Sequence, residues 1–231
     1  MISVIIPTYN EESHIREIIK RLWKYDENNL VKEIIISDGG STDDTVNIAR
    51  SETVKVIISP KGRAVQMNQG AAEATENILY FLHADSIPPK NFSSSISKAY
   101  LDGAISGCFR LAFDHNHWLL NAHCWFTRFD VNAIRFGDQS LFVTNNVFKN
   151  CGGFNIGLQM MEDQEIIHRI KKHGKFKVMS DAVTTSARKY LDNGVFRMQG
   201  IFYRIWLMYY LGYSQKRLLQ LHRTLIKNHK L

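Results

Sequence analysis

The sequence predicts an α/β fold, in which a mostly parallel sheet is flanked by helices and followed by a basic helical tail. In the first half of the chain, apolar runs of strand length alternate with segments whose apolar residues recur at helical spacing. Strands that read as continuous apolar runs are typical of a parallel sheet covered on both faces. With 231 residues, 45% of them hydrophobic, the chain suits one domain with a full core.

The first half is regular. Asn10 is expected to cap the first helix, and Ser41 with Asp44 to form a capping-box-like start for the second. A third helix is expected from about Arg63 to Ala74. The four strands of this half are expected at residues 2–6, 33–37, 54–58 and 78–82.

The second half is less regular. One helix is expected to start at Glu162 and to run to about His173, and two more cover about 194–229 with a break at Gly212. A further helix is expected near 116–130. Strand-like segments lie at 105–111, 139–144, 176–179 and 181–185.

Charge is concentrated at the C-terminal end. Residues 188–231 hold nine Lys and Arg against the single acid Asp192, whereas residues 1–187 hold 20 Lys and Arg against 21 Asp and Glu. The net charge of +7 therefore belongs to the tail, which is expected to meet something negative.

The segment 195–211 of this tail has an amphipathic pattern. It spans 17 residues and carries two arginines, so it is too short and too polar for a membrane span. Arg197 and Arg204 fall on one stripe with aromatic residues round the rest, a pattern typical of a helix that lies on a membrane surface. The alternative is that the helix packs on the domain or on a second subunit. Basic residues follow at Lys216, Arg217, Arg223, Lys227 and Lys230.

The three cysteines, odd in number and without CxxC spacing, indicate neither a disulfide framework nor a zinc site. A reducing cytosol is therefore expected. Met1 runs directly into the first strand, which leaves no room for a signal peptide.

Polar residues collect where the predicted strands end. Tyr9, Asn10, Asp38, Arg63 and Asp85 all lie at or just beyond a strand's carboxyl end. Ligands of parallel sheets gather at that edge. A carboxylate held there, such as Asp85, can bind a divalent cation and through it a nucleotide diphosphate.

Six short motifs carry a resemblance. In their order and spacing they resemble the family 2 glycosyltransferases of the GT-A fold, and within them a small bacterial branch found beside radical-SAM and arsenosugar-type gene sets. The resemblance covers about residues 2–213 and implies a catalytic domain at 1–190, with the extension 191–231 in the same structural unit. The motifs are VIIPTYNE at 4–11, SDGGSTD at 37–43, GRAVQMNQGA at 62–71, LHAD at 82–85, GDQ at 137–139 and MED at 161–163.

For the nucleotide, the resemblance implies that Pro7, Tyr9 and Glu11 line the nucleoside pocket and that Asp38 accepts a hydrogen bond from the base. Arg63 would lie against the nucleotide or its diphosphate. The alternatives are that Asp38 only caps the turn at Gly39 and Gly40, and that Arg63 is a solvated helix-start residue.

For the chemistry, the resemblance implies that Asp85 binds Mg²⁺ or Mn²⁺ and that Asp163 is the general base, with Glu162 able to exchange roles with it. Such enzymes invert the anomeric carbon in one in-line displacement. His83 stands where most of the family has a first Asp, and it would contact the ribose or coordinate weakly. As alternatives, Asp85 is a helix-entry residue and Asp163 a helix-start acid without catalytic duty.

The remaining candidates have two readings each. Asp138 contacts the acceptor or caps a strand, and Arg188 with Lys189 reaches the diphosphate or lies on the surface. The histidines, His123 among them, lack metal-ligand spacing and are expected to be structural or exposed. Gln199 and Arg204 are wrongly spaced for the Q-x-x-R-W element of processive synthases, which favours a single addition.

The sequence thus predicts a metal-assisted, inverting glycosyltransferase of the cytoplasm, at the inner face of the membrane if its tail binds there. The expected partners are a UDP-, dTDP- or GDP-sugar, an acceptor of unknown identity, a membrane surface and a second copy of the chain, with no nucleic acid. One rival is a nucleotidyltransferase, which would need a glycine-rich basic loop in place of Pro7-Thr8-Tyr9-Asn10. Another is a non-catalytic member that binds nucleotide or acts as a membrane scaffold.

Overall fold

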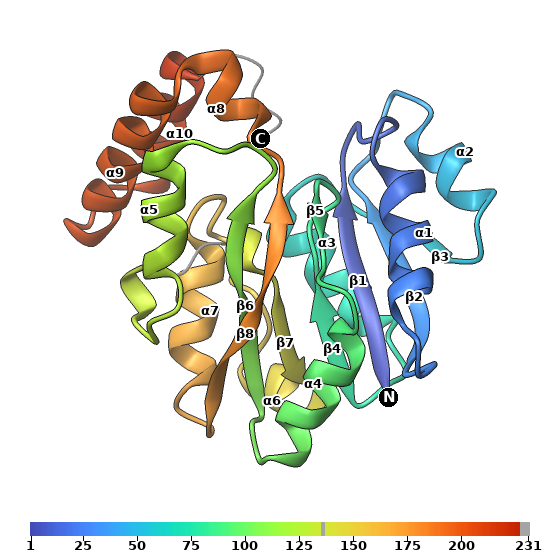
Figure 1. Cartoon of the computed structure of the whole chain (residues 1–231). Coiled ribbons are helices and arrows are strands. Elements are labelled where there is room, and N and C mark those ends of the chain that lie inside the picture. Colours follow the sequence, from blue (N-terminus) through green and yellow to red (C-terminus); the bar gives the residue numbers. More distant parts are fainter. Residues whose placement is uncertain (135–136, 227–231) are drawn as a thin grey trace.

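A single sheet with helices on both faces organises the molecule (Figure 1). The computed structural model describes residues 1–134 and 137–226, so Phe136, Lys227 and Lys230 lie outside the described residues. The strands are β1 (Ile2–Thr8), β2 (Val31–Asp38), β3 (Lys55–Ile58), β4 (Ile78–Phe81), β5 (Ser86–Ile87), β6 (Ser106–Phe113), β7 (Leu141–Thr144) and β8 (Phe176–Thr185). The α-helices are α1 (Ile15–Tyr25), α2 (Thr45–Arg50), α3 (Arg63–Ala72), α4 (Phe92–Leu101), α5 (Trp118–Phe126), α6 (Asn145–Asn150), α7 (Glu162–Ile170), α8 (Arg188–Asn193), α9 (Val195–Tyr210) and α10 (Gln215–Leu225).

The sheet is mostly parallel, which confirms the predicted fold class. Its order is β3-β2-β1-β4-β7-β6-β8-β5. Strands β3, β2, β1 and β4 run parallel, β7 runs antiparallel to both β4 and β6, and β6 pairs in parallel with β8. The carboxyl ends of β1, β2, β4, β6 and β8 therefore share one edge. The reversed β7 brings its amino end, and the residues before it, to the same edge.

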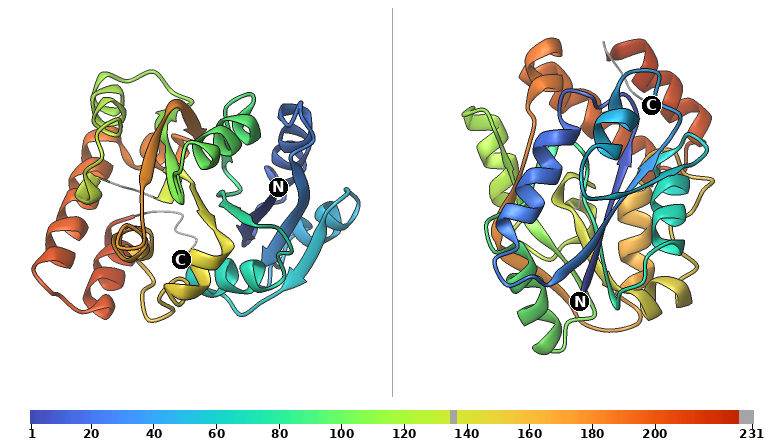
Figure 2. Two further views of the ribbon diagram at one scale, coloured as in Figure 1. Left: turned by 90° about the horizontal axis from the view of Figure 1, so that it is seen from below. Right: turned by 90° about the vertical axis from the view of Figure 1, so that its right-hand side faces the viewer.

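Alternation along the central strands divides the core between the two faces. In β1, Val4 and Ile6 pack in the cluster that includes α1 and α4, whereas Ile5 packs against α3, α6 and α7 on the other face. Each of these side chains is fully buried. This burial on both sides explains why the strand reads as a continuous apolar run. Figure 2 shows the helices on either side of the sheet.

The C-terminal helices form a third cluster with α5. Met198, Ile201 and Ile205 of α9 are buried against α5, α8 and α10. The alternative in which this helix packs on the rest of the protein is therefore confirmed for one of its faces. The sequence had indicated that aromatic residues occupy the rest of the helix around the arginine stripe. In the structure the buried face is instead largely aliphatic. None of the helices in residues 1–134 and 137–226 is long and apolar enough to cross a bilayer.

Both predicted helix caps are wrong. Helix α1 begins at Ile15, and Asn10, whose φ is 55°, instead accepts a hydrogen bond from the Thr42 backbone N–H at 2.8 Å. Ser41 donates its hydroxyl hydrogen to Asp38, and α2 begins only at Thr45. Asn10 and Glu12 of the β1–α1 loop thus accept hydrogen bonds from backbone N–H groups of the β2–α2 loop, an arrangement that local spacing does not reveal.

Other differences concern short or continuous elements. The two strands expected over 176–185 are one strand, β8, and the helix expected near 116–130 is restricted to α5. Helices α6 and α8 were not predicted, because six residues are too few to show helical periodicity. Helix α4 was missed because its run of serines is poor in helix formers.

Candidate active site

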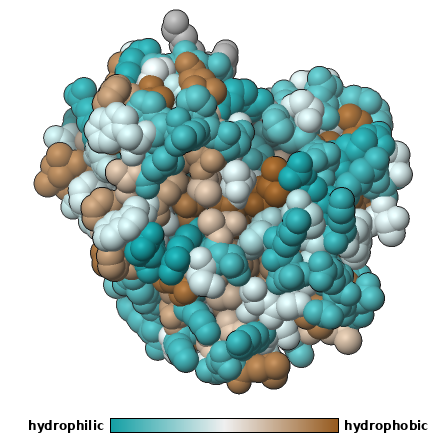
Figure 3. Space-filling model, viewed as in Figure 1, coloured by the Kyte–Doolittle hydropathy of each residue, from teal (hydrophilic) through white to brown (hydrophobic). Residues whose placement is uncertain are grey.

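A pocket of about 520 Å³ lies at the shared carboxyl edge of the sheet. Figure 3 shows the surface hollowed between the C-terminal helices and the side formed by β1 and α2. The volume is in the range of small-molecule sites. Except for Asp38, the predicted site residues all line this pocket: Pro7, Tyr9, Glu11, Arg63, His83, Asp85, Asp138, Glu162, Asp163 and Arg188.

One wall of the pocket follows the ends of β1 and β3. Pro7, Tyr9 and Glu11 lie here, and Lys61 places its Nζ 3.8 Å from the centre of the Tyr9 ring. An ammonium over an aromatic face is attracted to the ring's electron-rich side. Lys61 was not predicted as a site residue. The signal that could have identified Lys61 is its position just after a strand end, two residues before Arg63.

Asp38 is the one predicted site residue that the structure places outside the pocket lining. Its side chain is fully buried and does not line the pocket. One oxygen accepts from the backbone N–H groups of Gly40 and Ser41 at 2.9 and 2.7 Å, and the other accepts from the hydroxyls of Thr8 and Ser41. The carboxylate thus stabilises the turn after β2, as in the alternative reading, and has no free lone pair directed at a ligand.

Gln66 holds the two central loops together beneath this wall. Its side-chain amide donates to the Thr8 carbonyl at 2.7 Å and to the Ser37 carbonyl at 2.8 Å, so it joins the ends of β1 and β2. The residue is buried and also borders the pocket. Sequence reasoning did not identify it, although it lies one helical turn after Arg63 on the same face of α3.

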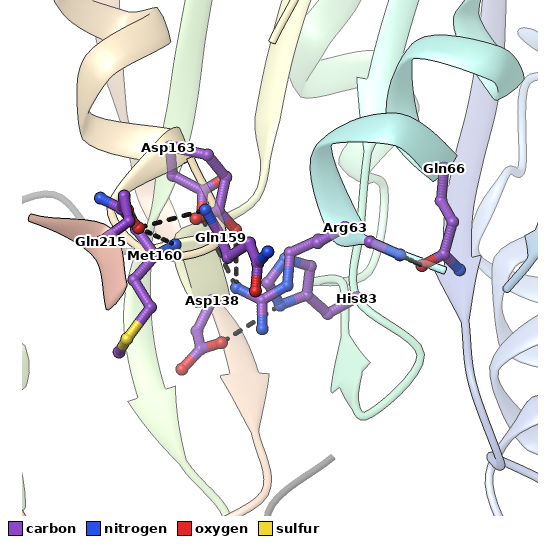
Figure 4. Close-up of polar contacts among 10 residues, drawn as sticks. Arg63, Gln66, His83, Asp138, Gln159, Met160, Asp163 and Gln215 are labelled. Carbon is purple, nitrogen blue, oxygen red and sulfur yellow. Dashed lines mark hydrogen bonds and ion pairs between the residues drawn. The ribbon is translucent and has the colours of Figure 1, made fainter. Parts of the chain in front are cut away.

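Arg63 and two acids form the centre of the pocket (Figure 4). The Arg63 Nη1 lies 3.0 Å from Glu162 Oε1 and 3.9 Å from Asp163 Oδ2. Arg63 opens α3 directly after Gly62, whose φ of 141° favours glycine. The acids open α7 after Met161, which adopts a left-handed φ of 68°, uncommon for a residue with a side chain. Two helix N-termini thus face each other across the pocket.

Burial controls the protonation of this cluster. It raises the pKa of Glu162 to about 7, although the charge of Arg63 acts in the opposite direction. Burial likewise raises the pKa of Asp163, against His83 and Arg63. Burial alone would lower the pKa of Arg63, but the neighbouring acids raise it, so the guanidinium stays charged. Glu162 is 1% exposed, and its Oε2 has no hydrogen-bond partner among the described residues.

His83 pairs with Asp138 on the far side of Arg63. The Nδ1 of His83 lies 3.2 Å from Asp138 Oδ1, at the point where the carboxyl end of β4 meets the amino end of β7. Burial lowers the pKa of His83, but the hydrogen bond with Asp138 and the negative charges of Asp138 and Asp163 together give a net upward shift. Burial raises the pKa of Asp138, yet His83, Lys189 and Arg63 lower it to about 2. Asp138 is therefore an ionised partner of His83, a contact that neither reading of Asp138 anticipated.

Asp85 is suited to a hard cation. It follows β4 at the pocket wall, is partly exposed, and accepts a long hydrogen bond of 3.4 Å from the Ser86 hydroxyl. Within the part of the chain that the structure describes, no three His, Cys, Asp or Glu side chains form a metal cluster. Mg²⁺ is commonly held by one or two carboxylates together with the substrate's phosphates. A single carboxylate at this edge fits that arrangement.

The opposite wall comes from the C-terminal helices. Arg188 and Lys189 border the pocket, Arg188 with an exposed side chain, and the Tyr190 hydroxyl donates to Gln199 Oε1 at 3.3 Å. His123, expected to be structural or exposed, also lines the pocket. The sequence did not identify this wall. The signal was the spacing of Gln199, Phe202 and Trp206, which repeats along one face of α9.

Gln215 fastens a loop of this wall to α10. Its Oε1 accepts from the backbone N–H groups of Gln159 and Met160 at 3.2 and 3.1 Å, and its Nε2 donates to the Met160 carbonyl at 3.3 Å (Figure 4). Gln159 and Met160 line the pocket just before the acid pair. The position of this loop therefore depends on the last helix.

The pKa shifts predict an acid limb in the pH profile of turnover. If Asp163 is the general base that the resemblance implies, it must be ionised, so the rate should fall as the pH decreases through its raised pKa, above the ordinary value of 3.8. Arg63→Gln removes a charge that lowers this pKa and should move the limb to higher pH. Initial rates of donor hydrolysis between pH 4 and 9 measure the limb. A limb that moves to lower pH in Arg63→Gln would contradict the assignment.

Two curated relatives have related sequences. One is a dolichyl N-acetyl-alpha-D-glucosaminyl phosphate 3-beta-D-2,3-diacetamido-2,3-dideoxy-beta-D-glucuronosyltransferase of Methanococcus voltae, 29% identical over 107 residues, covering 43% of this chain and 33% of the relative. The other is the succinoglycan biosynthesis protein ExoA of Rhizobium meliloti (strain 1021), 26% identical over 199 residues, covering 77% of this chain and 60% of the relative. The chain thus spans between a third and three fifths of their lengths.

Solved structures share the fold. The mannosyltransferase PcManGT of Pyrobaculum calidifontis, in complex with GDP-Man and Mn²⁺, superposes with a TM-score of 0.68 at 16% identity, covering 88% of this chain and 61% of that one. TarS of S. aureus, in complex with UDP, gives 0.66 at 20% identity, covering 80% and 60%. The architecture is therefore that of GT-A glycosyltransferases. The family model "Glycosyl transferase family 2" matches residues 3–166, more than half of the sequence, so the chain belongs to glycosyl transferase family 2.

Proposed function

We propose that this chain is an inverting, metal-assisted glycosyltransferase that moves one sugar from a nucleotide-diphosphate donor to an acceptor hydroxyl. The observation that carries the proposal is the joint lining of one pocket by Asp85, Arg63 and Asp163, which come from three distant segments. This set provides a carboxylate for a cation, a fixed positive charge and a base. The complexes of structural neighbours with GDP-Man and Mn²⁺ and with UDP support the same donor class.

On the donor side, Pro7, Tyr9 and Glu11 would hold the nucleoside and Arg63 the diphosphate. Asp85 would hold Mg²⁺ or Mn²⁺ against the two phosphates, where the cation neutralises the charge that develops on the leaving group. Arg63 adds a further positive charge that burial does not remove. His83, held by Asp138, would contact the ribose or coordinate the cation weakly.

On the acceptor side, Asp163 would take the proton of the attacking hydroxyl. Its place at the N-terminus of α7 stabilises the ionised form, while burial makes it more basic than a surface carboxylate. The unpaired Oε2 of Glu162 is positioned to meet a polar group of the acceptor or donor. Arg188 and Lys189, on the opposite wall, would contact the diphosphate or the acceptor.

The finer assignments stay proposals. We place the enzyme in the cytoplasm, at the inner face of the membrane where its basic tail can meet anionic lipid. We also infer that the chain belongs to the bacterial branch associated with radical-SAM and arsenosugar gene sets, which its motif order resembles. The domain boundary near residue 190 and a homodimer remain predictions.

The function is tested with a donor panel. Purified protein is incubated with UDP-, GDP- and dTDP-sugars, with Mn²⁺ or with EDTA, and the released nucleoside diphosphate is measured. We expect slow, Mn²⁺-dependent hydrolysis of the nucleotide-sugars that carry one particular base. Pyrophosphate release from a nucleoside triphosphate would instead indicate a nucleotidyltransferase. Absence of both binding and turnover for every donor would overturn the enzyme assignment.

A further inference from the structure

Large apolar side chains are exposed on one side of the C-terminal lobe, the part of the molecule formed by α5 and helices α8 to α10. Six of them define what we call the aromatic patch: Trp118, Trp125 and Phe126 of α5, and Phe196, Tyr203 and Leu207 of α9. Trp118 is 66% exposed and Phe196 is 63% exposed. Single exposed apolar residues are ordinary, but contiguous exposed patches mark interaction sites.

The patch is continuous across two helices. Phe196, Tyr203 and Leu207 recur at intervals of seven and four residues, and Trp118 and Trp125 are seven apart, so each set lies along one face of its helix. The rings of Trp118 and Phe196 lie with their centres 5.9 Å apart and join the two faces. Figures 1 and 2 show α5 and α9 on the same flank of the molecule. The buried side of α9, with Met198, Ile201 and Ile205, points the opposite way into the lobe.

Positive charge borders the patch. Arg197 and Arg204 are exposed and lie one position after Phe196 and Tyr203, about 100° round the helix, and Arg197 Nη2 donates to the Leu225 carbonyl of α10 at 2.8 Å. Arg128 places its guanidinium carbon 4.6 Å from the centre of the Trp125 ring. Asp130, beside α5, is ion-paired with Lys171 at 2.5 Å, and Asp192 is the one acid in 188–231. The patch is thus aromatic with a cationic rim.

This combination distinguishes between possible occupants. In a symmetric dimer the same patch would face itself, which would bring Arg197 and Arg204 of the two copies close together, with Asp192 the one acid of residues 188–231 to offset them. A bilayer with anionic head groups suits both the aromatic surface and the cationic rim. Aromatic side chains partition to the membrane interface, and the arginines of the rim attract the negative charge of the lipids. We propose that the aromatic patch binds the surface of a phospholipid bilayer containing anionic lipid. This proposal rests on the membrane location proposed above and names the surface of the protein that would contact the bilayer.

The first experiment is co-sedimentation of the full chain with vesicles of phosphatidylcholine, alone or with 25% phosphatidylglycerol. The double variant Phe196→Ser/Leu207→Ser should partition into the mixed vesicles at least about tenfold more weakly, because two exposed apolar side chains no longer enter the interface. Arg204→Gln should weaken binding about fivefold on the mixed vesicles and leave binding to neutral vesicles unchanged.

A matched control removes equal apolar surface elsewhere. Ile58 and Leu101 are 57% and 79% exposed and lie on β3 and α4, outside the patch. Ile58→Ser/Leu101→Ser should bind vesicles like the unaltered protein. Equal losses in the two double variants, or no binding of the unaltered protein to mixed vesicles, would overturn the proposal. A dimer in light scattering that only Phe196→Ser/Leu207→Ser dissociates would assign the patch to a second copy instead, and would also overturn it.

Quenching of tryptophan fluorescence tests directly whether the aromatic patch faces the bilayer. Vesicles with brominated acyl chains should quench tryptophan fluorescence of the unaltered protein, and the variant Trp118→Phe/Trp125→Phe should lose most of that quenching while still sedimenting with the vesicles. Undiminished quenching in this variant would contradict the proposed orientation. Donor binding, measured in parallel, separates this test from the proposed function, since none of the residues substituted in the three double variants lines the pocket.

Discussion

Asp163→Asn should retain donor binding and lose sugar transfer, by about 10²–10⁴-fold in turnover. Asparagine keeps the shape of the side chain but cannot accept the acceptor's proton. The donor wall should stay in place, because Arg63 keeps its 3.0 Å contact with Glu162. Calorimetric titration with the donor and the rate of nucleoside diphosphate release measure the two properties separately.

Glu165→Gln is the control for this variant. Glu165 lies on the same helix but pairs with Arg169 at 2.5 Å and does not line the pocket. Its loss should cost a small amount of stability and leave turnover unchanged. Unchanged turnover in Asp163→Asn would reassign the base, and Glu162→Gln would then identify whether its neighbour has that role.

Asp85→Ala should remove the metal dependence of donor binding. A cation that bridges phosphates contributes several kcal/mol to the stabilisation of developing charge, so turnover should fall by roughly 10²–10³-fold. Donor affinity should become the same with Mn²⁺ as with EDTA. The measurement is a donor titration at several Mn²⁺ concentrations for the variant and the unaltered protein.

Asp102→Ala serves as the comparison, because Asp102 is about half exposed and contacts Lys177 at 3.4 Å, outside the pocket. This variant should keep full metal dependence. If the unaltered protein binds donor equally well with and without cation, Asp85 has no role in metal binding and the positive charge of the site comes from basic side chains such as Arg63.

The donor side of the pocket was largely predictable because parallel strands end at one edge. Tyr9, Asp85 and Arg63 follow strand ends, and the structure places all three at the pocket. The same reasoning failed for Asp38, because a carboxylate after a strand can equally satisfy the N–H groups of its own turn. Position at a strand end indicates proximity to a site but does not determine which way the side chain points.

The opposite wall was not predictable in the same way. Gln199 and Tyr190 belong to no motif, and their meeting depends on how α8 and α9 fold back over the sheet edge. The pairing of His83 with Asp138 likewise depends on β7 running antiparallel to β4, which sequence patterns do not show. These are long-range arrangements, whereas helix and strand periodicity reports only local order.

The pocket's walls have separate origins along the chain. Residues 7–85 form one wall and residues 111–223 the other. The hydrogen bonds of Gln215 to Gln159 and Met160 join the second wall to the last helix. Substitutions that reshape the second wall can therefore change which molecule receives the sugar without disturbing the groups that recognise the nucleotide. Exchange of the later segment between related chains should be a practical route to new glycoside products from an unchanged activated sugar.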